Sequence, residues 1–152
     1  MSAVRMCIVL ATVSLLGITC KNETVSGIPA GLDVFTATLT GANERPTPVT
    51  TTATGTAIVT VVGTILTWKV DVVNIDSVNA AHIHIGGPEE AGNVTRSLNP
   101  LSTDTNFTGT LANGSAPVSD SVLALMRAGR TYVNVHTLKN GDGEIRGQLR
   151  KQ

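Results

Sequence analysis

Apolar and polar residues alternate along most of the chain beyond residue 32, a pattern typical of strands with one face in a core. The alternation predicts strands over 33–40, 51–62, 65–75, 94–98, 107–111, 131–138 and 144–150, and one more beginning near residue 80. Within 65–75, Leu66, Trp68 and Val70 share one face, opposite Thr67 and Lys69. We therefore expect Trp68, the only tryptophan, to lie in the core.

Glycine, proline and asparagine separate these segments and indicate turns. The expected breaks are the proline-containing loop 41–48, the turn 63–64, the loop 86–93 and the glycine-rich turn 140–143. The only helical candidate is 119–128, which Ser119 or Asp120 can cap and which Gly129 can end. About eight short strands and one short helix predict an all-β fold, an antiparallel sandwich or a Greek-key barrel.

The first twenty residues differ from this pattern and are typical of a secretory signal peptide. Arg5 supplies a positive charge, and the apolar stretch 6–18 is too short for a membrane span. Cys20 stands where a bacterial lipoprotein signal places its lipidated cysteine, although 16–20 matches that motif loosely. The alternative is an ordinary cleaved signal that leaves a free thiol. We expect residues 21–31 to be a flexible tether and 32–151 the folded domain.

Composition narrows the class of function. The chain has 152 residues, enough for one domain, and its formal net charge is zero with no basic patch, which argues against nucleic-acid binding. Of the two cysteines, Cys7 lies inside the signal-like stretch, so no disulfide is expected within the domain. No serine or cysteine nucleophile motif and no phosphate-binding glycine loop is recognisable. The sequence therefore indicates an exported protein without an evident catalytic nucleophile.

All three histidines lie in two segments of mixed apolar and polar character. In a strand His82 and His84 share a face, with Ile83 and Ile85 opposite. The same rule groups the polar residues of the last hairpin: Tyr132, Asn134 and His136 on one strand, and Glu144, Arg146 and Gln148 on the next. If the apolar faces fill the core, the three histidines lie together on its outer, polar side.

Two interpretations of the histidines follow, and a third is a pH-sensitive or ligand-binding surface. His82, His84 and His136 could bind copper or zinc and leave one coordination position for water or substrate, with ligating nitrogens about 3–3.5 Å apart. Alternatively, His82 and His84 hydrogen-bond to Asn134, Glu144 and Arg146 in a structural network. In the metal interpretation, Asn134, Glu144 and nearby carbonyls could hold the rings in the ligating tautomer. Glu144 and Arg146 could also form an ion pair.

Three stretches of the sequence resemble the CHRD domain family, the module named after chordin. They are 35–46, in which Arg45 replaces an expected apolar residue, the segment 80–84, and the long closing motif 128–149. The resemblance implies an extracytoplasmic, all-β, immunoglobulin-like sandwich. The family's biochemical activity is poorly defined, so the resemblance leaves the function open.

The histidine pattern is also similar to the copper-ligand layout of copper/zinc superoxide dismutases, which are β-sandwiches. That likeness implies copper-type ligands at His82, His84 and His136. A bridging histidine, a zinc subsite, the structural disulfide and the channel arginine have no clear equivalents, with Arg146 at best a substitute.

Our leading expectation is an exported binding or structural module at the cell envelope or secreted, with an unknown extracellular or envelope partner. It would contact membrane only through a lipid anchor on Cys20. The alternative is a copper- or zinc-binding protein.

Overall fold

The computed structural model describes residues 31–152. The signal peptide, the lipidation of Cys20 and nearly all of the tether therefore lie outside the described residues. The described chain forms the following elements: β1 (Leu32–Thr40), η1 (Gly41–Asn43), β2 (Thr54–Val62), β3 (Ile65–Ile75), β4 (Val78–Ile85), β5 (Val94–Ser97), β6 (Phe107–Pro117), α1 (Asp120–Arg127), β7 (Thr131–Thr137), β8 (Ile145–Gln148) and β9 (Arg150–Lys151). No helix among them is both long enough and apolar enough to cross a bilayer.

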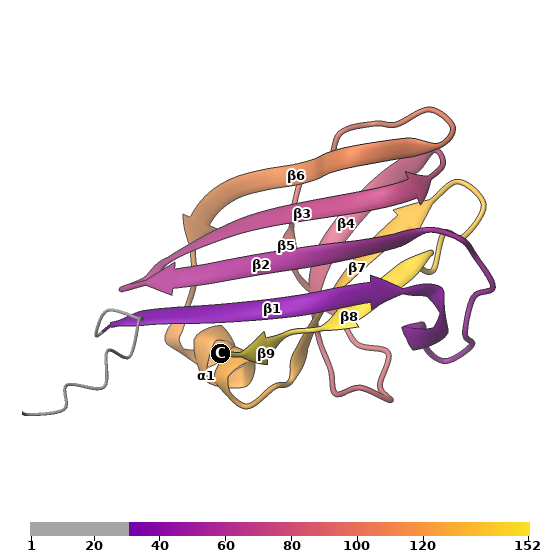
Figure 1. Cartoon of the computed structure of the whole chain (residues 1–152). Coiled ribbons are helices and arrows are strands. Elements are labelled where there is room, and N and C mark those ends of the chain that lie inside the picture. Colours follow the sequence, from indigo (N-terminus) through magenta and orange to yellow (C-terminus); the bar gives the residue numbers. More distant parts are fainter. Residues whose placement is uncertain (1–30) are drawn as a thin grey trace, which may run out of the picture.

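The strands form one antiparallel sheet in the order β5-β4-β7-β8-β1-β2-β3-β6, and the short β9 pairs with β1. The sheet curls, so that β4, β7 and β8 lie behind β1, β2 and β3 (Figure 1). The predicted all-β class with one short helix is confirmed. The two halves of the curled sheet enclose the core between them.

The core contains the apolar faces that strand alternation predicts. Phe35, Val59 and Val70 on one half meet Ile83 and Val133 on the other, all essentially inaccessible to solvent. Trp68 is 7% exposed and its Nε1 donates a hydrogen bond to the carbonyl oxygen of Leu98, 3.2 Å away. The expectation that Trp68 lies in the core is confirmed.

The helix and most strand limits agree with the sequence prediction. Ser119 caps α1 by accepting a hydrogen bond from the backbone N–H of Val122, and Gly129 follows the helix at a positive φ of 67°. Two strand limits were wrong. β2 begins at Thr54 instead of 51, and β6 runs to Pro117 instead of 111, because residues 112–117 have little apolar alternation yet pair with β3.

The polar side of β4, β7 and β8 lies outside the apolar core but is not open to solvent. All seven residues of β7 are buried. Two of the predicted loops cover this side, 86–93 and 140–143. Arg146 and Gln148 donate hydrogen bonds to the carbonyl oxygens of Gly87 and Gly86 in the first loop. The result is a buried polar layer between the sheet and its covering loops.

Candidate metal centre

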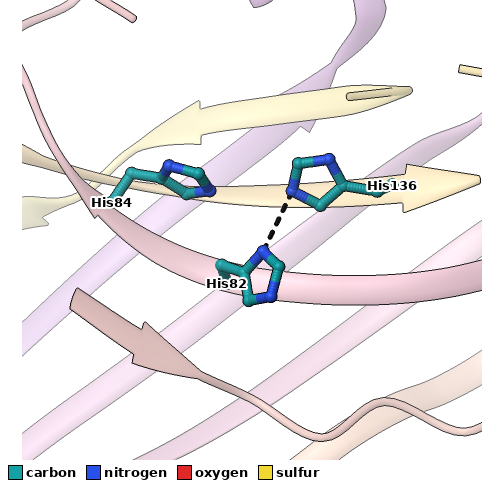
Figure 2. Close-up of side chains that lie close together, drawn as sticks. All are labelled: His82, His84 and His136. Carbon is teal, nitrogen blue, oxygen red and sulfur yellow. Dashed lines mark hydrogen bonds between the residues drawn. The ribbon is translucent and has the colours of Figure 1, made fainter. Parts of the chain in front are cut away.

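The three histidines converge from two neighbouring strands. His82 and His84 stand on β4, and His136 on β7, where it pairs with Ala80. One ring nitrogen of each histidine can be chosen so that all three lie within 4.8 Å of one another. Nδ1 of His82 is 3.1 Å from Nε2 of His136 (Figure 2). Strand parity therefore brings together the three residues that it placed on one face.

Two of the imidazoles are held by backbone carbonyls. Nδ1 of His84 lies 2.8 Å from the carbonyl oxygen of Gly92, and Nδ1 of His136 lies 3.0 Å from that of Gly141. A carbonyl oxygen can only accept, so each Nδ1 carries the hydrogen. In the neutral ring the lone pair is then on Nε2. Such outer hydrogen bonds are what orients metal-binding histidines.

The carbonyl anchor for His84 depends on a glycine. A Cβ at Gly92 would collide with the carbonyl oxygen of Ile85. The backbone N–H of Gly92 donates to the hydroxyl of Tyr132, 3.0 Å away. The loop is thus held tightly against β4 and β7, at the position where its carbonyl meets His84.

Nε2 of His84 is buried and has no hydrogen-bond partner in residues 31–152. A buried polar atom without a partner costs free energy, and native proteins rarely leave one so. Figure 2 shows this ring and that of His136 turned toward one another, with His82 alongside. A metal ion between the rings would use the Nε2 lone pair.

The electrostatics favour neutral imidazoles. Burial lowers the pKa of His82, and the neighbouring His84 lowers it further. Burial also lowers the pKa of His84 and of His136, although their carbonyl partners act in the opposite direction. Neutral imidazole is the form that binds metals, and the lowered pKa values of the three histidines favour that form near pH 7.

The geometry is close to that of a three-histidine site. The separation of 3.1 Å between His82 and His136 falls within the range expected for two nitrogens on one ion. The widest nitrogen pair, at up to 4.8 Å, would have to close by roughly 1.5 Å for the three rings to share one ion. Three histidine ligands would leave a fourth coordination position on the metal. Of the three side chains, His84 and His136 are buried and His82 is half buried.

The polar residues that sequence reasoning placed beside the histidines bond elsewhere. Asn134 Nδ2 donates to Glu44 Oε2 at 3.3 Å and to the carbonyl of Asp142 at 3.4 Å. Glu144 Oε2 accepts from Thr137 Oγ1 at 3.1 Å and from Asn140 Nδ2. The imidazoles thus meet carbonyls and one another instead of these side chains.

Arg146 also departs from expectation. No ion pair joins it to Glu144 in the described part of the chain; its guanidinium lies 3.5 Å above the ring of Tyr132. His84 also stacks on the ring of Tyr132, with ring centroids 4.9 Å apart and planes inclined by 11°. Tyr132, which the sequence only placed on the polar face, therefore connects the histidines to Arg146.

Sequence reasoning missed Glu44 as a member of this layer. Glu44 follows η1, is only 2% exposed, and faces Asn134. Burial raises its pKa to about 7, although Arg146 acts in the opposite direction. The sequence signal that could have pointed to Glu44 was its place in the stretch 35–46, where it is a charged loop residue just before Arg45 and Pro46.

Comparison with known proteins gives one match. The model of the CHRD domain family matches residues 35–149, nearly all of the described chain. No curated protein and no solved structure matches the chain.

Proposed function

The chain belongs to the CHRD domain family, and we propose that it is a binding module that holds a copper or zinc ion through His82, His84 and His136. The observation that carries this proposal is the buried Nε2 of His84, which has no partner in the described chain and lies beside two other ring nitrogens. The family supports a binding or structural module in general terms. The histidines supply the specific ligand.

The donor set favours copper or zinc over hard cations. Imidazole nitrogen suits both metals, whereas calcium and magnesium prefer oxygen. Copper(II) is expected to bind more tightly, because it follows the usual order of affinities among divalent ions. Zinc would be tetrahedral, with water as the fourth ligand. The likeness to superoxide dismutases extends only to these three ligands, and dismutase activity is not part of the proposal.

Titration of the purified protein with Cu(II) and Zn(II), together with metal analysis, tests the site. We expect one equivalent to bind to wild type and binding to be lost in His136→Ala. His82→Asn should lose binding too. It is more informative than His136→Ala, because its amide can keep the hydrogen bond to His136 but is a poor metal ligand. Asn79→Ala, an exposed change on the same strand β4, is the control. Equal, weak binding by wild type and His136→Ala would contradict the proposal.

The module is further proposed to act outside the cytoplasm, anchored through a lipid on Cys20. Its signal-like first twenty residues and its family, whose domain is typically extracellular, support this location. Mass spectrometry of the membrane fraction should find a lipidated N-terminus at Cys20. Cys20→Ser should release the protein from membranes, whereas Cys7→Ser should not. An unmodified N-terminus, or one lacking Cys20, would exclude the anchor. An envelope or extracellular partner remains part of this proposal.

A further inference from the structure

A small pocket of about 270 Å³ lies beside β8, between the loop that follows β1 and the loop that follows β4. Its lining includes three arginines, Arg45, Arg146 and Arg150, with Glu89 as its only carboxylate. None of the three histidines lines the pocket. His82, Asn134 and Arg146 are aligned across β4, β7 and β8, so two strand spacings, roughly 10 Å, separate Arg146 from His82 along the sheet.

Arg146 is the unusual member of this lining, because its charge is buried without a carboxylate hydrogen-bonded to it. It is 1% exposed. Within residues 31–152 its side-chain hydrogen bonds run only from Nη2, to the carbonyl oxygens of Gly87 and Pro88. Nε and Nη1 therefore keep donor capacity. Buried arginines are normally paired, and leaving one uncompensated is costly.

The two carboxyl groups whose charges act on Arg146, Glu44 and Glu89, are poor counterions for it. Glu89 is 76% exposed and is engaged by Arg45, whose Nε and Nη2 bond its two carboxylate oxygens at 2.7 and 3.1 Å. Glu44 has a pKa of about 7, because burial opposes its ionisation, so much of it is neutral near that pH. The charges of Arg45 and Glu89 cancel each other, so Arg146 and Arg150 give the pocket a net positive charge.

We propose that this pocket binds a small oxyanion, with the buried guanidinium of Arg146 as its anchor and Arg150 as a second positive group at its exposed side. Guanidinium groups recognise both carboxylate and phosphate oxygens through charge-assisted hydrogen bonds. The volume suits a single acid group of a ligand. The inference goes beyond the metal site and does not depend on it.

The test is isothermal titration calorimetry on the full chain with sodium acetate and with inorganic phosphate, at constant ionic strength made up with chloride. Metal is removed beforehand on a chelating resin, because soluble chelators carry carboxylates of their own. Saturable binding of either anion at one site supports the proposal. The anion that binds more tightly shows whether the acid group of the ligand is a carboxylate or a phosphate. Saturable binding of neither would overturn it.

Substitutions at exposed positions assign the binding to this pocket without risking the fold, as replacing the buried Arg146 would. Arg150→Gln should weaken the affinity about twofold to fivefold, the effect of one partly screened charge. Glu89→Gln should strengthen it by a similar factor, because it removes the competing carboxylate. Lys69→Gln, which removes an exposed charge from β3, a strand that does not line the pocket, should leave the affinity unchanged. Identical affinities in all three variants would overturn the assignment.

Discussion

Nδ1 of His82 lies 3.1 Å from Nε2 of His136, although 54 residues separate the two along the chain. Since Nδ1 of His136 donates to the carbonyl of Gly141, its Nε2 is an acceptor in the neutral ring, and His82 donates to it from Nδ1. To ligate a metal through Nδ1, His82 must carry its proton on Nε2 instead. The half-buried position of His82 allows that nitrogen to meet water.

The lowered pKa values of the histidines predict that the fold loses stability in acid. An unfolded histidine binds a proton near pH 6.5, whereas those in the folded protein do so only at lower pH. Between these values the unfolded state binds more protons, so the free energy of unfolding falls as the pH drops below about 6.5. Urea unfolding between pH 8 and pH 5 measures this, and His136→Ala should reduce the dependence. An unchanged slope in that variant would contradict the prediction.

Glu44 is expected to have the opposite effect. Its pKa rises from 4.5 to about 7 on folding, so the folded state binds more protons in this window and stability falls as the pH rises through it. Glu44→Gln imitates the protonated form, and its amide can donate to Oδ1 of Asn134, which is buried without a partner in the described chain. We expect this variant to be more stable than wild type at pH 8, by on the order of 2 kcal/mol.

The same urea unfolding at pH 5 and pH 8 separates the two groups. The gain from Glu44→Gln should be full at pH 8 and much smaller at pH 5, where Glu44 is protonated in the folded state and only its partial ionisation in the unfolded chain still contributes. Glu89→Gln removes an exposed carboxylate and should show no comparable gain. A gain of equal size at both pH values would indicate a packing effect instead of a titration.

Strand alternation predicted the parts of the site that depend on local periodicity. It placed His82 and His84 on one face, and pairing of β4 with β7 then brought His136 beside them. It could not predict the carbonyl anchors at Gly92 and Gly141, because these are backbone groups whose position depends on how two loops fold over the sheet. Glu44 was missed for the same reason: a loop residue has no periodicity to indicate what it faces.

The turn that holds His136 is predicted to tolerate alanine at one glycine and not at another. Gly143 has a φ of 142°, and a Cβ there would lie 2.6 Å from the side chains of Asn134 and Glu44. Gly143→Ala should cost roughly 2–4 kcal/mol of stability and weaken metal binding, because the turn must move. At Gly141 a Cβ would meet nothing within 4 Å.

Gly141→Ala is therefore the matched control, two residues away in the same turn. It keeps the carbonyl that accepts from His136 and should change the free energy of unfolding by less than about 0.5 kcal/mol. Thermal unfolding with Trp68 fluorescence, followed by Cu(II) titration of both variants, makes the comparison. Equal destabilisation by the two substitutions would show that the contact with Asn134 and Glu44 is not what restricts Gly143.

Tyr132 is expected to act through two separable contributions, its hydroxyl and its ring. The hydroxyl accepts from the backbone N–H of Gly92, so Tyr132→Phe should cost about 1 kcal/mol and loosen the carbonyl that orients His84. The ring lies between His84 and Arg146. Tyr132→Leu should therefore cost about 1–2 kcal/mol more, because it also removes both stacking contacts.

Urea unfolding and metal titration of the two variants distinguish these contributions. If the hydroxyl positions the loop, Tyr132→Phe lowers metal affinity several-fold while the stacked layer remains. If only the ring matters, Tyr132→Phe matches wild type in both measurements and the whole loss appears in Tyr132→Leu. The second outcome would mean that Gly92 stays in place without the hydroxyl, held only by its close packing against Ile85. The orientation of His84 would then depend on the close fit of Gly92 and not on Tyr132.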